Sequence, residues 1–113
     1  MRKELVEDIV NWSKSSFPDL TKEKQTLKLH EEIGELESAE TEEEKMYEMA
    51  DVFIVATILY KRFNCELGKR FMRFYDMFEV EPYVENKMKK NKSRIWKKVE
   101  NGTYHHEESE NNE

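Results

Sequence analysis

Two amphipathic patterns occupy the N-terminal third of the chain. In each, apolar residues stand at positions i, i+4 and i+7, a spacing that places them on one face of an α-helix. They are Leu5, Ile9 and Trp12 in the first pattern and Leu29, Ile33 and Leu36 in the second. The patterns predict helices over residues 4–16 and 22–39, and Pro18 stops the first of them.

A third helix is predicted directly after a short turn. Thr41 followed by Glu44 fits a capping box, in which each side chain satisfies backbone donors at the start of a helix. We expect this helix to extend to about Phe63. Residues 49–60 make it the most apolar element of the sequence, although the stretch contains Asp51 and is too short to span a membrane.

The remainder of the chain gives weaker patterns. Apolar or aromatic residues at positions 67, 71, 74, 75 and 78 predict a fourth helix over residues 66–79, and Pro82 is expected to open a short fifth one. The polar residues from 101 to 113 are expected to form a disordered acidic tail. The sequence thus predicts a single all-α domain over residues 1–100.

The amino-acid composition supports the all-α class and indicates the cellular compartment. The chain has 113 residues, of which 39% are charged and 37% hydrophobic, with few Gly and Pro. So polar a chain with long apolar runs is expected to bury some of them against a copy of itself. Because Cys65 is the single cysteine and the N-terminus lacks the apolar core of a signal peptide, we expect a soluble, cytoplasmic protein with no membrane contact.

Charge is distributed unevenly along the chain. The net charge of −6 argues against nucleic-acid binding. Residues 31–51 nevertheless carry ten acids and one base, whereas residues 85–98 carry six Lys, one Arg and one acid. One chain therefore offers both a cation site and an anion site.

Paired carboxylates stand on the second and third predicted helices. Glu32 lies three residues before Glu35, as Glu48 does before Asp51, so each pair shares one side of its helix. If the two helices form an antiparallel hairpin, the pairs can face each other. Asp51 stands among apolar neighbours, where a lone carboxylate would cost several kcal/mol. We therefore expect a cation between the pairs.

The ligand types indicate which cation is bound. Oxygen donors suit Mg²⁺, with Mn²⁺ as the alternative, whereas zinc prefers His or Cys and a di-iron bundle would need Glu-x-x-His. Mg²⁺ usually shares its shell with phosphate oxygens, so the cluster predicts a phosphate-bearing substrate. Candidate contacts to that substrate are Lys28 on the second helix and, at helical spacing near the C-terminus, Lys87, Asn91 and Arg94 with Trp96 just beyond.

These residues resemble the motifs of the MazG-like, all-α nucleoside triphosphate pyrophosphohydrolases. The matching segments are EEIGE from Glu31 to Glu35, EMAD from Glu48 to Asp51 and KMKKNKSRIW from Lys87 to Trp96. The resemblance implies a four-helix-bundle-type fold that assembles as a homodimer or homotetramer. It also implies hydrolysis of a nucleoside triphosphate to the monophosphate and pyrophosphate, by attack of a metal-activated water on the α-phosphorus.

The resemblance also implies a role for each residue. Four acids would hold the metal, namely Glu32, Glu35, Glu48 and Asp51. Glu31 would assist the reaction or position water, and it would be a catalytic group together with Glu32 and Glu35. Lys87, Asn91 and Arg94 would contact the triphosphate or sugar. The base and the pathway, including a house-cleaning role in nucleotide metabolism, stay open, because residues 64–85 depart from the simplest members.

Alternatives remain beside each of these predictions. Asp51 could be satisfied by a lysine or a backbone group instead of a metal. The basic run could be an ordinary solvated helix end, or it could bind an acidic partner or RNA. His105 and His106 are expected to have no specific role. The alternative for the whole chain is a catalytically inactive helical interaction protein that keeps the same bundle.

Overall fold

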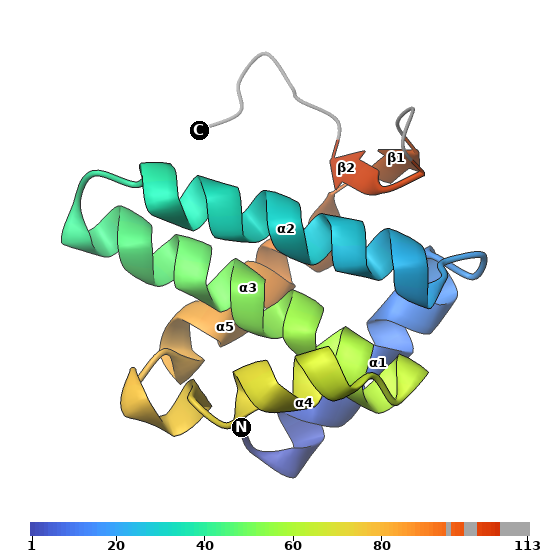
Figure 1. Cartoon of the computed structure of the whole chain (residues 1–113), viewed down its shortest axis with the longest axis horizontal. Helices are drawn as coiled ribbons and strands as arrows, with labels where there is room; N and C mark the ends of the chain where they lie inside the picture. Colours follow the sequence, from blue (N-terminus) through green and yellow to red (C-terminus); the bar gives the residue numbers. More distant parts are fainter. Residues whose placement is uncertain (95, 99–101, 107–113) are drawn as a thin grey trace.

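The computed structural model describes residues 1–94, 96–98 and 102–106 and confirms the all-α class (Figure 1). Within this part of the chain the α-helices are α1 (Lys3–Ser16), α2 (Lys22–Ser38), α3 (Glu42–Phe63), α4 (Glu66–Met72) and α5 (Glu81–Ser93). A 3₁₀ turn, η1 (Tyr75–Met77), precedes α5, and a two-stranded hairpin, β1 (Trp96–Lys98) and β2 (Tyr104–His106), follows it.

Helix α3 is the central element, and it contacts α1, α2, α4 and α5. The predicted capping box opens it, since the Glu44 amide donates to Thr41 Oγ1 at 3.1 Å and the Thr41 amide to Glu44 Oε1 at 2.9 Å. The helix ends at Phe63, and Asn64 caps it in the left-handed conformation at φ 52°. Residues 52–59 are buried without interruption, because other helices cover α3 on several sides.

Two apolar clusters lie on different sides of α3. The larger joins α1, α3 and α5 through buried residues such as Ile9, Phe53 and Val84. The smaller joins α2 to α3 through Leu29, Val52, Val55 and Leu59. Helices α2 and α3 run side by side as an antiparallel pair (Figure 1). This is the hairpin in which the two carboxylate pairs can face each other.

The predicted helix over residues 66–79 is shorter than expected and ends at Met72. Gly68 packs so closely against α3 that a Cβ there would lie 2.6 Å from the Ala56 carbonyl oxygen. Tyr75 then turns inward, is buried and donates to Glu81 Oε1 at 2.8 Å. This tertiary contact favours a 3₁₀ turn over further helix, and α5 follows with Pro82 in its first turn.

The predicted disordered tail is wrong for residues 102–106. Thr103 is buried, and β2 pairs antiparallel with β1, with Trp96 opposite His106. Gly102 permits the turn with its φ of +87°. Tyr104 packs its ring on Phe17, a contact between distant segments that a polar local composition does not reveal. Residues 101 and 107–113 lie outside the described residues.

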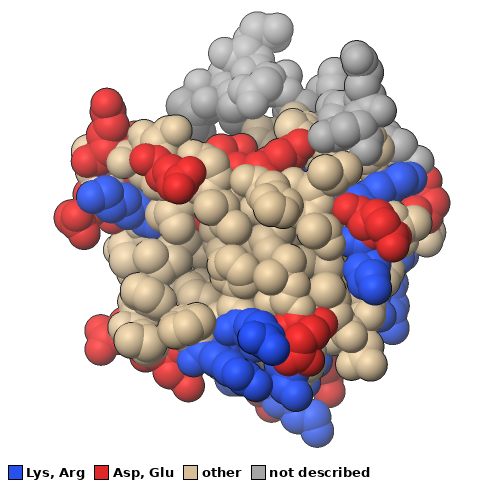
Figure 2. All heavy atoms as spheres, viewed as in Figure 1, with Lys and Arg blue, Asp and Glu red and all other residues tan. Residues whose placement is uncertain are grey.

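The face formed by α2, α3 and α4 carries neutral side chains at its centre, and charged groups of both signs surround them in the view of Figure 2. Ile33, Leu36 and Phe71 are partly buried there against the smaller apolar cluster. None of the helices in the described part of the chain has the length and apolar character needed to cross a membrane.

Candidate metal and nucleotide site

Three carboxylates from α2 and α3 converge at one point. One oxygen each from Glu32, Glu48 and Asp51 lies within 4.8 Å of the other two. Glu32 comes from α2, and the i, i+3 spacing on α3 turns Glu48 and Asp51 toward it. The antiparallel packing of consecutive helices therefore brings together carboxylates that are well separated in the sequence.

Two of these carboxylates have a buried oxygen that accepts no hydrogen bond from the described residues, namely Glu32 Oε1 and Glu48 Oε1. Glu32 is only 6% exposed. Burial, and then the charge of Asp51, holds the pKa of Glu32 well above its usual range, and Lys28 opposes the shift. Burial also raises the pKa of Glu48 to about 7, reinforced by the charges of Asp51 and Glu35. The cluster is short of positive charge.

Two lysines supply part of that charge. Lys87 Nζ lies 3.0 Å from Asp51 Oδ2, and Lys28 Nζ lies 3.3 Å from Glu32 Oε2. Asp51 therefore does have a lysine partner, which is one of the alternatives that the sequence leaves open. The pairs leave Glu48 without a positive partner of its own among the described residues, and Glu32 keeps one unsatisfied oxygen. Hard oxygen donors at this spacing fit Mg²⁺ or Mn²⁺.

The other two predicted acids lie at different distances from this point. Glu35 is exposed, yet it borders the same cavity, and its charge contributes to the raised pKa values of Glu32 and Glu48. Glu31 instead faces the C-terminal hairpin. His105 Nε2 lies 3.1 Å from Glu31 Oε1, and Thr103 Oγ1 lies 3.4 Å from Glu31 Oε2.

A cavity of about 290 Å³ runs from the carboxylates toward the start of α2. On α2 its lining extends from Lys24 to Glu35, which is about 17 Å of helix. On α3 it extends in the opposite direction, from Asp51 to Ile58, as the antiparallel packing requires. A weak contact from Gln25 Nε2 to the Val55 carbonyl oxygen, at 3.5 Å, joins α2 to α3 along this lining.

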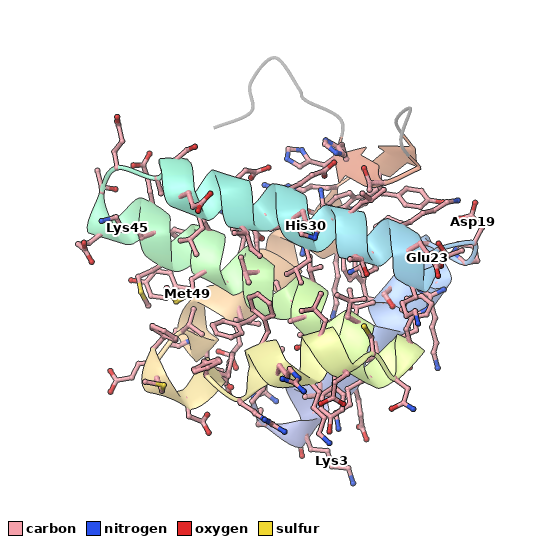
Figure 3. All side chains as sticks on the ribbon, viewed as in Figure 1. Lys3, Asp19, Glu23, His30, Lys45 and Met49 are labelled. Carbon is pink, nitrogen blue, oxygen red and sulfur yellow. The ribbon has the colours of Figure 1, made fainter. Side chains whose placement is uncertain are left out.

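The cavity therefore has two chemically different ends. We call the carboxylate region the acidic end; it comprises Glu32, Glu35, Glu48 and Asp51, with Lys28 and Lys87 beside it. We call the other region the aromatic end; it comprises Trp12, Phe17, Trp96 and Tyr104. Figure 3 labels Lys45 near the turn between α2 and α3, and Asp19 and Glu23 at the opposite end of α2, where the hairpin lies.

The basic segment is arranged differently from the prediction. Lys87 and the buried Asn91 do lie on α5, and Asn91 lines the cavity. Arg94 does not share their helical face, because α5 ends at Ser93 and Arg94 adopts an extended conformation. Arg94 is not among the residues that line the cavity. Its guanidinium lies 3.5 Å from Asn91 Oδ1, and its backbone amide donates to the Asn91 carbonyl oxygen at 3.3 Å. Trp96 belongs to β1, where its ring contacts Trp12 and Phe17.

Sequence reasoning missed several residues that line the cavity. These are Trp12, Phe17, Lys24, Gln25, Thr103, Tyr104, His105 and His106. The sequence pattern places Trp12 on the apolar face of its helix, and it places His105 and His106 in the predicted tail. No motif marks these positions. The one available signal was the presence of aromatic residues at the end of α1 and in a polar C-terminal segment.

Comparisons with known proteins give a similarity among solved structures. No protein-family model matches the chain, and no curated protein matches it. Among solved structures the chain is similar to the cyanophage S-2L MazG-like pyrophosphohydrolase bound to dGDP and three catalytic Mn²⁺ ions per active site. The identity is 28%, the match covers 93% of this chain and 95% of that one, and the TM-score is 0.48.

Proposed function

We propose that this protein is a metal-dependent nucleoside triphosphate pyrophosphohydrolase of the MazG-like type. The proposal is carried by the convergence of Glu32, Glu48 and Asp51 beside a cavity, with buried carboxylate oxygens that no described group satisfies. In the reaction a water oxygen bonds to the α-phosphorus and the bond from that phosphorus to the bridging oxygen breaks. The products are the nucleoside monophosphate and pyrophosphate.

In this proposal Glu32, Glu35, Glu48 and Asp51 hold Mg²⁺ or Mn²⁺. Such an ion would lower the pKa of an attacking water and would neutralise charge on the phosphate oxygens. Glu31 is linked to this set through Lys28, whose Nζ lies 3.8 Å from Glu31 Oε1 and 3.3 Å from Glu32 Oε2, and its contacts with Thr103 and His105 fix the orientation of its carboxylate. A carboxylate so placed can accept a proton from the attacking water.

The positive side chains of the site serve the phosphates. Lys28 and Lys87 are 17% and 13% exposed and lie directly beside the carboxylates, so they can donate to triphosphate oxygens. Asn91 lies further along the cavity and suits a sugar or base edge. Arg94 lies outside the lining, and we propose for it only a contact with the outer part of a bound triphosphate.

Incubation with Mg²⁺ or Mn²⁺ and a panel of ribo- and deoxyribonucleoside triphosphates, followed by pyrophosphate detection, tests the function. We expect release with at least one nucleotide and a loss of about a hundredfold or more in Asp51→Asn, since groups that merely support metal ligands are worth ten- to a hundredfold. Glu37→Gln, an exposed acid on the same helix as Glu32, is the matched control. Absence of pyrophosphate from every nucleotide would falsify the proposal.

One observation favours the alternative of an inactive helical interaction protein. Lys87 and Lys28 already pair with Asp51 and Glu32, so two of the carboxylates are compensated within the chain itself. This alternative predicts that Mg²⁺ leaves the melting temperature unchanged and that Glu35→Gln is neutral or stabilising. It leaves Glu48 without a partner, and for that reason we place it second.

We also propose that the chain forms a homodimer or homotetramer through the neutral face of α2, α3 and α4. Ile33, Leu36 and Phe71 are only partly buried there, although they continue an apolar cluster. Light scattering at micromolar concentration tests this, and a strictly monomeric mass contradicts it.

We also propose a cytoplasmic setting for the protein. Such a setting keeps the Cys65 thiol reduced, and it fits a role in nucleotide metabolism.

A further inference from the structure

The aromatic end of the cavity is built from four rings that contact one another. Phe17 stands at its centre, with ring centroids 5.2 Å from Trp12, 5.4 Å from Trp96 and 4.4 Å from Tyr104. Phe17 is buried, whereas the other three are partly exposed, and all four border the cavity. A planar aromatic ligand is what such a wall stacks against most favourably.

The hairpin that supplies two of these rings is attached to the helices at several points. The Trp96 indole donates to the Asn91 carbonyl oxygen at 3.1 Å, and the Tyr104 hydroxyl donates to Asp19. The turn approaches α2 closely, since a Cβ on Gly102 would lie 2.9 Å from the Lys24 side chain. His105 and Thr103 both contact Glu31, so the same strand reaches toward the acidic end.

Two buried amides line the cavity in addition to the aromatic rings. Gln25 is 4% and Asn91 5% exposed, and both line the cavity. Their side-chain contacts within the described part of the chain are long: 3.5 Å from Gln25 Nε2 to the Val55 carbonyl oxygen, 3.8 Å from Asn91 Nδ2 to Met88 Sδ, and 3.5 Å from Arg94 to Asn91 Oδ1. An amide carries both donors and an acceptor, so each retains capacity for a ligand. Polar groups inside an otherwise apolar pocket select ligands with matching hydrogen-bonding edges.

We propose that the aromatic end and these two amides form the subsite for the heterocyclic base of a nucleotide, and that the C-terminal hairpin supplies half of its wall. The base stacks against the cavity side of this aromatic wall, and Gln25 and Asn91 face its polar edge. The phosphates then extend along α2 toward the acidic end. This inference rests on the proposed function for the phosphate end, but the binding of the base can be measured separately.

Intrinsic fluorescence reports on this subsite directly, because the two tryptophans of the chain, Trp12 and Trp96, both line the cavity. The protein is titrated in Mg²⁺ with purine and pyrimidine nucleoside monophosphates and, in parallel, with ribose 5-phosphate, which lacks a base. We expect at least one base-bearing ligand to change the tryptophan emission and to bind roughly tenfold or more tightly than ribose 5-phosphate, as base–aromatic stacking predicts. Equal affinities overturn the proposal.

A matched pair of variants refines the test. Tyr104→Leu keeps an apolar side chain but removes the ring, and it should weaken base-bearing ligands about tenfold while leaving the affinity for inorganic triphosphate within twofold. Phe74→Leu, at an exposed aromatic residue away from the cavity, should change neither affinity. A Tyr104→Leu protein that loses both ligands equally contradicts a base subsite. If this variant does not fold, the wild-type comparison with ribose 5-phosphate decides.

The outcomes separate this inference from the proposed function. Pyrophosphate release combined with no preference for base-bearing over base-free ligands leaves the function standing and removes the subsite. A clear preference for base-bearing ligands combined with no pyrophosphate from any triphosphate keeps the subsite and removes the proposed reaction. Failure of both measurements removes both.

Discussion

The acidic and aromatic ends of the cavity differ in how they affect the stability of the protein. At the aromatic end the side chains that meet the ligand also pack on one another, so the site and the fold are stabilised together. At the acidic end, burial raises the pKa values of Glu32 and Glu48, which means that their charges destabilise the folded chain. Buried carboxylates whose charge destabilises the folded chain are typical of functional sites.

Removal of the central ring should have the largest effect on stability. Phe17→Ala takes a ring with 5% exposure out of contact with three aromatic neighbours, and we expect the free energy of unfolding to fall by about 3–5 kcal/mol. Urea denaturation in EDTA measures this. The exposed Phe74→Ala is the control and should change stability by less than about 0.5 kcal/mol. A cost below about 1 kcal/mol for Phe17→Ala would show that the rings contribute little.

Metal binding should stabilise the acidic end next most strongly. At a hundredfold excess over the dissociation constant, a ligand that binds only the folded state adds about 2.7 kcal/mol. For a domain of this size that corresponds to roughly ten degrees or more in melting temperature. Calorimetry with and without Mg²⁺ or Mn²⁺ measures the shift, which Asp51→Asn should abolish and Glu37→Gln should keep. An unchanged melting temperature in the wild type favours the interaction-protein alternative.

The metal-free protein should lose stability as pH rises from about 5 to 8. The pKa of Glu48 in the folded state is about 7, and that of Glu32 is also raised, so both lie above their unfolded values. Such groups bind more protons in the folded state, and their favourable contribution disappears as pH passes through the folded pKa. Urea titrations in EDTA at several pH values should show this decline. Saturating Mg²⁺ should reverse it, since a metal favours the ionised carboxylates.

The smallest effect expected is a gain in stability. Glu32→Gln removes one buried charge facing Asp51, and at pH 8 without metal it should raise the free energy of unfolding by about 1 kcal/mol. The same variant should lose catalytic activity, so stability and function would change in opposite directions. Glu37→Gln, which is exposed, should leave both unchanged. A destabilised Glu32→Gln protein would mean that its pairing with Lys28 outweighs the repulsion.

Local patterns predicted the helical elements where the determining contacts are close in sequence. The capping box at Thr41 and the stop after Phe63 lie within a turn of the residues that they govern. The prediction failed at Met72, where α4 ends early, because the buried Tyr75 and its bond to Glu81 depend on packing against α3. It failed again at the hairpin, whose strands are held by contacts with α1 and α2.

By itself the sequence determined the acidic end, because two i, i+3 carboxylate pairs on consecutive helices need only a short turn to face each other. Only the tertiary structure decided the aromatic end, the lysine partner of Asp51 and the position of Arg94. Phe17 and Tyr104 are far apart in the chain, and no local period relates them. Helix geometry is encoded within a few residues, whereas a wall built from both ends of the chain exists only once the core has brought them together.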